Sequence, residues 1–219
     1  PTSMRVVERV RRAARGAKCG HAGTLDPLAS GVLVVAIGRA TRAIDSLMAG
    51  PKRYETEIDL SGTTDTLDSE GAVTPVEIAT PPSHGQIESA LARMRGTFPQ
   101  TPPAFSAVKI GGRRAYALAR RGRAEEPPPR NVTVHELEVV DFAFPLVRVR
   151  IRCDKGFYVR SLARDLGRAL GTGGFCRSIR RTAVEPFTLA DAIPLESLPA
   201  ALEPSHLRPV GSPSTDPRP

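Results

Sequence analysis

Apolar and polar residues follow two different spacings along the chain, and each spacing predicts one kind of secondary structure. Residues 146–153 alternate strictly, so that Val147, Val149 and Ile151 face one side of a strand and the intervening arginines face the other. The uninterrupted apolar run at 32–37 predicts another, buried strand. Further strands are predicted at 53–60, 131–142 and about 176–185.

Helices are predicted where apolar residues recur every three or four positions and suitable residues stand at the ends. The first helix has Ser3 as its cap, runs to about Arg15 and ends at Gly16. Ser83 and Gln86 form a capping box for a helix over 84–95. Three more helices are predicted at 40–48, 113–121 and about 158–170, the last ending at Gly171.

Helices and strands interleave irregularly, and several strands follow one another like hairpins. This order predicts an α+β fold with a mixed, mainly antiparallel sheet and flanking helices rather than a parallel wound sheet. A chain of 219 residues suits one large domain or one domain with an appendage. We expect one domain over 1–203 and a disordered Pro/Ser-rich tail over 204–219.

Composition excludes several classes of protein. Forty percent of the residues are hydrophobic, but no run reaches the ~18 apolar residues of a membrane helix. No basic-then-apolar leader opens the chain, so we expect a cytoplasmic protein with no membrane contact. Three widely separated cysteines without a C-x-x-C pair indicate neither a disulfide framework nor a zinc site.

Recognisable cofactor and metal motifs are also missing. "GTGG" at 171–174 lacks the Lys-Ser/Thr of a phosphate loop, and G-x-G-x-x-G does not occur. The four histidines never stand at metal-ligand spacing. We therefore expect no metal and no cofactor.

Positive charge is concentrated in three segments. The net charge is +8, and basic residues gather at 5–18, 109–123 and 148–168. Arginine dominates these clusters, and its planar guanidinium suits phosphates and nucleic-acid bases. A solvated basic surface in an arginine-rich proteome explains the same charge equally well, so charge alone decides nothing.

One carboxylate, Asp26, stands in the turn-rich stretch "GHAGTLDPLASGVLVVAIGRATR" at 20–42. An acid before proline is usually a turn former whose side chain bonds the backbone. Two features favour a functional group instead. Apolar structure anchors the loop at both ends, and His21 offers an imidazole that can titrate or stack on a base.

A second constellation is "CDKGFYVRSLARDLG" at 153–167. Tyr158 and Arg160 stand at the head of the predicted helix, and Arg160 and Arg164 share a face. An aromatic side chain beside arginine suits base stacking. An ordinary core tyrosine with solvated arginines is about equally compatible with this stretch.

Six segments in order resemble the TruB family of pseudouridine synthases, which isomerise a uridine in the TΨC arm of tRNA. They cover most of residues 1–187, and their agreement in sequence and spacing is far more specific than any single motif. The segments are "PTSMRVVERVRR", "GHAGTLDPLASGVLVVAIGRATR", "KRYETEIDLSGTTDTLDSEG", "QTPPAFSAVKIGGRRAYALARRG", "CDKGFYVRSLARDLG" and "IRRTAVEPF". The resemblance implies the pseudouridine synthase fold with a central RNA-binding cleft.

The resemblance also implies catalytic roles. Asp26 falls on the family's catalytic aspartate, which attacks the uracil base or its ribose carbon. Tyr54 matches the aromatic that stacks on the target base, and by position it is a candidate for removing the proton from carbon 5. Tyr158 and Arg160 match the pair packed around the aspartate, with the arginine bound to its carboxylate.

Further positions are implied to bind the substrate. His21 matches the histidine that contacts the flipped-out nucleotide, and Ile179 replaces a leucine of the family while keeping an apolar wall. Residues near 100–129 correspond to the family's RNA-gripping insertion. Its basic residues expected to bind RNA are Lys109, Arg113 and Arg114.

The resemblance thus predicts a monomeric, cofactor-free tRNA pseudouridine synthase with tRNA as its partner. Two alternatives stay open: an RNA-binding or tRNA-folding module with weak or no catalysis, and a pseudouridine synthase for another RNA. The K-P-x-G part of the family's opening motif is missing, so we expect an incomplete start. We also expect the C-terminal RNA-binding domain to be missing, which affects affinity more than chemistry.

Overall fold

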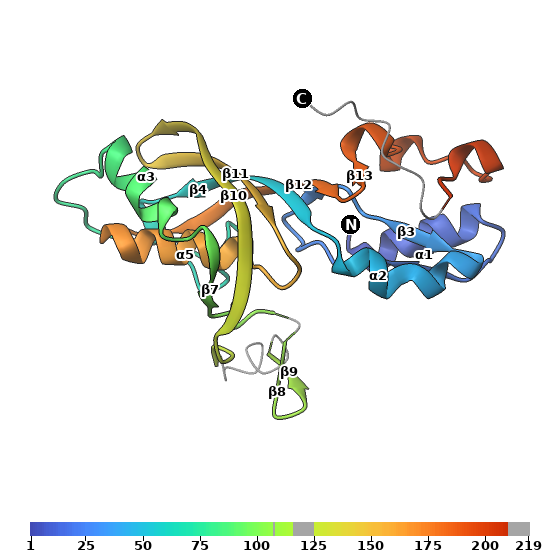
Figure 1. Cartoon of the computed structure of the whole chain (residues 1–219), viewed down its shortest axis with the longest axis horizontal. Helices are drawn as coiled ribbons and strands as arrows, with labels where there is room; N and C mark the ends of the chain where they lie inside the picture. The colour runs from blue at the N-terminus through green and yellow to red at the C-terminus, as the bar shows by residue number, and fades with distance from the viewer. Residues whose placement is uncertain (107, 116–124, 210–219) are drawn as a thin grey trace. The chain divides into compact units, whose positions relative to one another are not determined.

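The structure is a computed structural model that describes residues 1–106, 108–115 and 125–209 (Figure 1). They divide into two compact units. The first unit comprises Pro1–Arg53 and Arg180–Pro219, and the second comprises Tyr54–Ile179. The chain passes between the units within strand β4 (Lys52–Asp59) and within strand β12 (Phe175–Val184).

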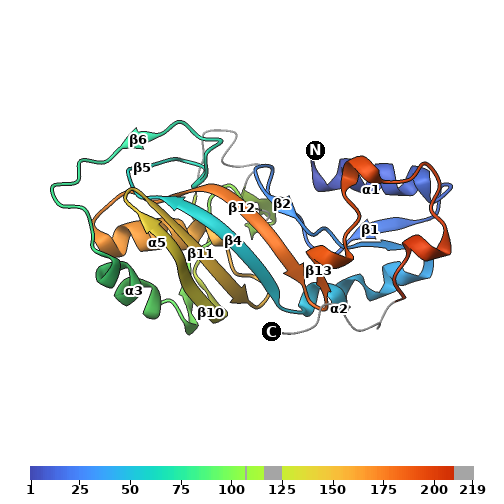
Figure 2. The same cartoon turned by 90° about the horizontal axis from the view of Figure 1, so that it is seen from above.

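Helix α1 (Ser3–Ala13) opens the first unit and packs on strands β1 (Cys19–His21) and β3 (Val35–Ile37), which pair antiparallel. A 3-10 helix (Gly38–Ala43) leads into α2 (Ile44–Ala49). Two short strands pair with the second half of β12 (Figure 2): β2 (Ser30–Gly31) runs parallel to β12, and β13 (Phe187–Thr188) runs antiparallel to β12. Short 3-10 helices follow at Leu189–Asp191, Leu195–Ser197 and Pro204–His206.

The buried face of α1 follows the predicted period, but its cap does not. Val7, Val10 and Ala13 are buried. The capping oxygen belongs to Thr2, whose side chain accepts the Arg5 N–H at 3.3 Å. Ser3 lies one residue inside the helix because a long-range contact, described below, uses its hydroxyl.

The strand predicted at 32–37 is wrong in its first half. Only Val35–Ile37 form β3, while residues 32–34 have no regular structure. Val32 is still buried, and its N–H donates to the carbonyl of Arg181 at 2.8 Å. The apolar run therefore predicts the burial of Val32 correctly. It does not predict the backbone conformation, because the hydrogen-bond partner of Val32 is a residue far away in the sequence.

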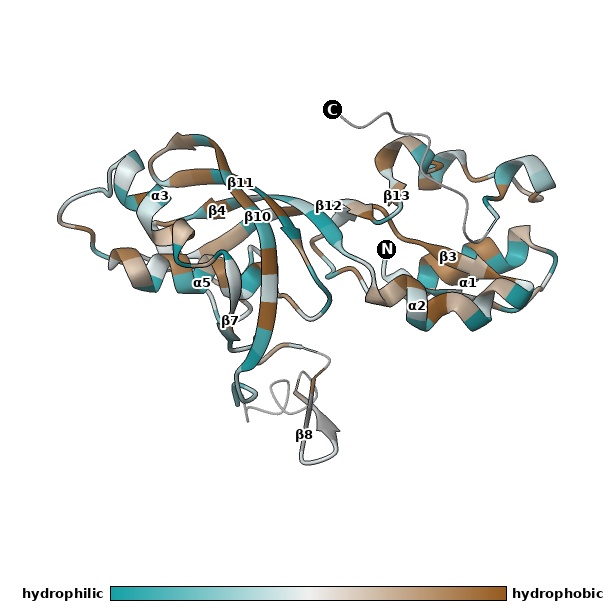
Figure 3. Ribbon diagram, in the orientation of Figure 1, coloured by the Kyte–Doolittle hydropathy of each residue, from teal (hydrophilic) through white to brown (hydrophobic). Residues whose placement is uncertain are grey.

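The second unit contains a sheet with strand order β12-β4-β11-β10-β7. β10 (Arg130–Ala143) and β11 (Leu146–Cys153) form the predicted hairpin, and β7 (Gly96–Gln100) pairs antiparallel with β10. Alternating hydrophobic and hydrophilic bands are visible along β10 (Figure 3). The predicted α+β fold with a mainly antiparallel sheet is confirmed.

Helices α3 (His84–Ala92) and α5 (Val159–Leu170) contact each other, and α3 also contacts β10 (Figures 1 and 2). The capping box of Ser83 and Gln86 is present. Gly171 ends α5 in a left-handed conformation with φ of 69°. Both helix ends are thus confirmed, because each depends on residues that are neighbours in sequence.

Two small hairpins complete the second unit. β5 (Gly62–Thr63) pairs with β6 (Thr74–Pro75), and β8 (Lys109–Ile110) pairs with β9 (Arg113–Arg114). The helix predicted at 113–121 is therefore wrong at its start, because the turn at Gly111 and Gly112 folds the chain into a hairpin. Its remainder from residue 116 lies outside the described residues.

Glycines allow the backbone to cross itself closely beside α5. A Cβ atom on Gly174 would lie 2.1 Å from the carbonyl oxygen of Ala163, and one on Gly173 would lie 2.2 Å from that of Gly62. The "GTGG" segment that lacks the phosphate-loop residues is therefore a packing element. It brings the start of β12 against α5 and β5.

None of the helices in the described part of the chain is long and apolar enough to cross a lipid bilayer.

We expect Gly174→Ala to lower the free energy of unfolding by about 1–3 kcal/mol, because the new methyl group overlaps a carbonyl of α5. The matched control is Gly85→Ala in α3, where a Cβ meets no atom within 4 Å. That exchange should be neutral or stabilise by about 0.5 kcal/mol. Urea titration of both variants measures the difference, and equal stabilities would contradict the packing role.

Candidate functional site

The Asp26 loop lies in the first unit between β1 and β2. The carbonyl of Asp26 accepts the N–H of Ala29 at 2.9 Å, so a turn follows the acid as its sequence predicts. The backbone N–H of Leu25 donates to the Ser3 hydroxyl at 3.0 Å. Ser3 is buried, so the first turn of α1 fixes the residue before Asp26. The Asp26 side chain itself is partly exposed.

Arg181 holds this loop on both sides of Asp26. Its Nε donates to the carbonyl of Val32 at 2.8 Å, and its Nη1 and Nη2 donate to the carbonyls of Thr24 and Gly23 at 3.3 and 3.1 Å. The residue is only 2% exposed. A buried guanidinium needs hydrogen-bond acceptors, and here loop carbonyls supply them.

Gly31 allows the loop to approach the Arg181 backbone. Its φ is +100°, and a Cβ atom there would lie 2.1 Å from the carbonyl oxygen of Arg181. Any side chain at this position would clash as well as strain the backbone. The loop that carries Asp26 is therefore closed by one buried side chain and one close backbone contact.

His21 is electrostatically coupled to the same arginine. Burial, and to a smaller extent the positive charge of Arg181, lowers the pKa of His21 below its ordinary value. Its Nδ1 is buried without a hydrogen-bond partner among the described residues. The imidazole is therefore neutral at pH 7, which is the form suited to stacking on a base.

Arg160 is buried at the start of α5, with 6% of its surface exposed. Its Nη1 donates to the carbonyl of Thr66 at 2.8 Å and lies 3.6 Å from Oδ2 of Asp68, while Nη2 donates to the carbonyl of Phe105 at 3.0 Å. Asp68 is 2% exposed, and its Oδ1 accepts the Thr66 hydroxyl at 2.7 Å. The guanidinium therefore joins to one helix two loops whose bonded carbonyls, at Thr66 and Phe105, are 39 residues apart.

Two further contacts position the head of α5. The side-chain amide of Gln100 accepts the N–H of Tyr158 at 2.9 Å and donates to its carbonyl at 3.2 Å. The carbonyl of Thr101 accepts from Ser161 Oγ at 2.7 Å and from Arg164 Nη2 at 2.8 Å. The segment that opens the predicted RNA-gripping insertion is thus anchored to the helix that carries Tyr158.

The predicted site residues fall in both units. Asp26 and His21 belong to the first unit, whereas Tyr54, Tyr158 and Arg160 belong to the second. Within the second unit, Tyr158 and Arg160 stand together at the head of α5. The predicted pairing of Arg160 with the Asp26 carboxylate stays a prediction.

The predicted substrate-binding residues also fall in defined elements. Ile179 lies in β12 and is buried. Lys109 lies in β8, and Arg113 and Arg114 lie in β9. Their roles toward RNA stay predictions.

Sequence reasoning missed Asp68 and Arg181. Asp68 stands in the family-like segment "KRYETEIDLSGTTDTLDSEG", in which only Tyr54 was given a role, and nothing in the local sequence sets this acid apart from its neighbours Asp65 and Glu70. Arg181 did carry a signal, because residues 179, 181 and 183 share one face of β12 and all three are buried. A charged residue in an inward-facing register position predicts a buried, fully bonded guanidinium.

Two of the three basic clusters have described side chains, and they differ in how their arginines are bonded. The basic side chains of the third, at 109–123, lie outside the described part of the structure. On the exposed face of the sheet, arginines of 148–168 and their neighbours are paired with acids. The pairs are Arg148–Asp141 at 2.8 Å, Arg150–Glu55 at 3.5 Å and Arg177–Glu57 at 3.6 Å. Arg160 and Arg164 in the same cluster are buried. The cluster at 148–168 is therefore largely structural.

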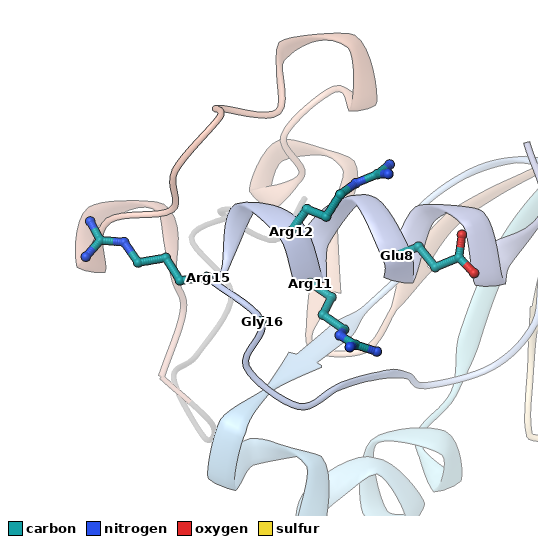
Figure 4. A pocket seen from close by; sticks show the side chains of 5 residues that line it. All are labelled: Glu8, Arg11, Arg12, Arg15 and Gly16. Carbon is teal, nitrogen blue, oxygen red and sulfur yellow. The ribbon is translucent and has the colours of Figure 1, made fainter.

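The cluster at 5–18 is exposed on α1. A hollow of about 460 Å³ is lined by Glu8, Arg11, Arg12, Arg15 and Gly16. The guanidinium groups extend in different directions from the helix (Figure 4). Among the described residues, no three His, Cys, Asp or Glu side chains gather in a way that would hold a metal ion.

Two family models match the chain in succession. "TruB family pseudouridylate synthase (N terminal domain)" matches residues 11–159, and "tRNA pseudouridylate synthase B C-terminal domain" matches residues 160–213. The expected tail from 204 therefore lies partly inside a segment that the second family model includes.

Curated relatives include tRNA pseudouridine synthase B from Corynebacterium efficiens, 46% identical over 201 residues, and that from Azoarcus sp., 42% identical over 215 residues. These matches cover 90% and 95% of this chain and 68% and 70% of the relatives.

Solved structures with a similar fold include a Cbf5-Nop10-Gar1 complex, with a TM-score of 0.66 and 30% identity. Another is an H/ACA RNP bound to a substrate RNA containing 2'-deoxyuridine, with a TM-score of 0.65 and 27% identity. The matches cover 86% and 90% of this chain and 46% and 48% of those chains. The chain thus spans about half the length of the solved chains.

Protonation of His21 should destabilise the folded protein. Its folded-state pKa lies below 6.5, so protonation opposes folding. The penalty is absent above about pH 6.5 and grows as the pH falls toward the folded-state pKa. A proton NMR titration should place the midpoint of His21 below 6.5. The stability lost between pH 7 and pH 5 should be smaller in His21→Gln, and a midpoint at or above 6.5 contradicts this assignment.

The three hydrogen bonds of Arg181 to loop carbonyls should stabilise the folded protein. Lysine keeps the charge but cannot reach three carbonyls in fixed directions, so Arg181→Lys should lower the free energy of unfolding by about 2 kcal/mol. Its neighbour Arg180 is exposed and provides the matched control, Arg180→Lys, which should be within about 0.5 kcal/mol of the wild type. Equal unfolding midpoints in urea for the two variants would show that Arg181 does not hold the loop.

Proposed function

The chain belongs to the TruB family of pseudouridylate synthases, and on that premise we propose that it isomerises a uridine of tRNA to pseudouridine with Asp26 as the nucleophile. The observation that carries the proposal is the fixed loop around Asp26. The carbonyls of Gly23 and Thr24 before the acid and that of Val32 after it accept hydrogen bonds from one buried arginine. A reactive group needs a backbone held in this way.

In the proposed reaction the Asp26 carboxylate attacks the uracil base or its ribose carbon. The bond between N1 and the ribose carbon breaks, the base rotates, and a bond forms from carbon 5 to the same ribose carbon. The bond between Asp26 and the substrate breaks, which regenerates the carboxylate. Once the C–C bond has formed, carbon 5 loses its proton and N1 takes one up. Product and substrate have the same atoms, so the isomerisation consumes no cofactor.

The base must leave its stack before the carboxylate can reach it, which costs roughly a few kcal/mol. Stacking on an aromatic side chain returns ~1–3 kcal/mol per base. We assign this stacking role to Tyr54 and a contact with the flipped nucleotide to His21. The neutral state of His21 supports this assignment, because a neutral imidazole loses little hydration when a base covers it.

We assign Arg160 the role of an electrostatic partner for Asp26. A guanidinium near a carboxylate favours its ionised, nucleophilic form. Support comes from the fixed position of Arg160, whose side chain is bound by Asp68 and by two loop carbonyls. Asp68 is then a positioning residue that acts through Arg160.

The relatives are named as tRNA-modifying synthases, and one similar structure holds a substrate RNA. On this basis we propose tRNA as the substrate class. The TΨC arm as target, the monomeric state and a cytoplasmic location stay predictions.

Tritium release from tRNA labelled at carbon 5 of uridine tests the chemistry. The wild type should release label, and Asp26→Asn should lose the activity by at least about 10³-fold because an amide is not a nucleophile. Asp45→Asn, on an exposed acid of α2, is the matched control and should keep the wild-type rate. A normal rate in Asp26→Asn would exclude the proposed mechanism.

The same assay distinguishes the proposed synthase from the alternative, an RNA-binding or tRNA-folding module. Tight tRNA binding by the wild type without any label release would favour it. Label release only from another RNA would keep the chemistry and change the target.

A further inference from the structure

Helix α1 carries the basic cluster that the fold leaves exposed and largely without acidic partners. We propose that its arginine face, defined as Arg5, Arg11 and Arg12 of the helix together with Arg15 just beyond its C-terminal end, binds the phosphate backbone of the RNA substrate. The proposal rests on the proposed function for its ligand, because an RNA substrate supplies the polyanion. It adds a binding surface on an element that carries none of the predicted catalytic residues.

The helix presents this face outward because its opposite face is buried. Val7, Val10 and Ala13 are buried, whereas the four arginines are exposed. Arg5, Arg11 and Arg12 form no ion pair among the described residues. Arg15 has one distant acidic neighbour, with 4.0 Å from its Nη2 to Glu203, and both side chains are more than half exposed. Such a pair contributes little and gives way easily to a phosphate.

The backbone of α1 is held in place by the C-terminal part of the first unit. The N–H of Leu202 donates to the carbonyl of Ala13 at 2.9 Å, and Arg9 Nη2 donates to the carbonyl of Leu195 at 2.9 Å. Arg9 is therefore already bound and is left out of the proposed face. Residues 5 to 12 span about 10 Å of helix axis, so the face can contact more than one phosphate at once.

The hollow beside Gly16 gives the face a shape as well as a charge. Arg11, Arg12 and Arg15 line it with Glu8 as the single acid. Their guanidinium groups extend in different directions (Figure 4). Three guanidinium groups against one carboxylate leave a net positive site. The planar fork of each arginine matches two oxygens of a phosphate.

Arg15 provides an independent indication. Its φ is 54°, a left-handed conformation in which an L-residue is strained and in which helix ends usually have glycine. Glycine does follow at once, as Gly16 with φ of 84°. A strained arginine at the helix end indicates that the side chain is kept for something other than folding.

Two exposed arginines on the sheet differ from this face in their pairing. Arg148 and Arg150 on the sheet are bound to acids at 2.8 and 3.5 Å. They have the same charge and similar exposure, but a phosphate would have to displace a carboxylate from each. They therefore supply a matched control for the loss of charge alone.

The experiment measures the equilibrium dissociation constant of the full chain for a tRNA transcript by fluorescence anisotropy at several salt concentrations. The triple variant Arg5→Gln, Arg11→Gln, Arg12→Gln should bind about threefold more weakly per arginine, or roughly 30-fold in total near 0.1 M salt. The slope of log affinity against log salt should fall by about one per arginine. The double variant Arg148→Gln, Arg150→Gln should match the wild type in both quantities.

Arg15→Gly separates binding from folding. Removal of the strained side chain should leave the thermal unfolding midpoint unchanged or raise it, while the dissociation constant rises about threefold. A lowered midpoint with unchanged RNA affinity would mean that the arginines serve the helix end only, as charges opposite its dipole, and would overturn the proposal.

RNA binding by the arginine face and the proposed synthase activity can fail independently of each other. Tritium release by the wild type together with wild-type affinity in the triple variant would overturn the α1 surface and leave the function intact. Equal losses of affinity in the triple variant and in the sheet control would also overturn it, because net charge alone would explain them. Loss of affinity confined to the α1 variants supports it even if the wild type releases no label.

Discussion

Two buried guanidinium groups bind backbone carbonyls of irregular loops, and the arrangement of the candidate site depends on them. Arg181 binds the loop that carries Asp26, and Arg160 binds the loops that contain Thr66 and Phe105. A loop without ladder partners has carbonyls to satisfy, and a buried arginine has five N–H donors to satisfy. The guanidinium N–H groups donate to the loop carbonyls, so both sets of polar groups are hydrogen-bonded. The loops are thereby fixed in position although they have no regular structure.

Arginine serves three different purposes in this chain, and burial decides which one applies. The buried residues Arg160 and Arg181 bind loop carbonyls. The sheet residues Arg148 and Arg150 are neutralised by acids on neighbouring strands. The α1 residues Arg5, Arg11 and Arg12 form no ion pair among the described residues, so their charge is available to a polyanion.

Local patterns in the sequence predict the elements whose partners are near in the chain. The β10–β11 hairpin follows from strict alternation, and α3 follows from the capping box of Ser83 and Gln86. α5 ends at Gly171 as expected. Two errors arise where a distant segment changes the backbone, at Val32, which bonds to Arg181, and at Ser3, whose hydroxyl accepts from Leu25. The wrong start of the helix predicted at 113–121 has a local cause, the turn at Gly111 and Gly112.

Patterns and motif order in the sequence predicted the α+β class, the main hairpin, the start of α3, the end of α5 and the family, and they named Asp26 as the candidate nucleophile. These predictions depend on periods of two and 3.6 residues, on cap residues and on motif order. All of these signals come from residues that are close together in the sequence. The tertiary structure decided which arginines are buried, paired or exposed, and it revealed Asp68 and Arg181. A charged side chain has no local pattern that names its partner, since Arg181 binds Gly23 across 158 residues and Arg160 binds Thr66 across 94. Such contacts exist only after the chain has folded, because burial makes a hydrogen bond to a distant carbonyl necessary.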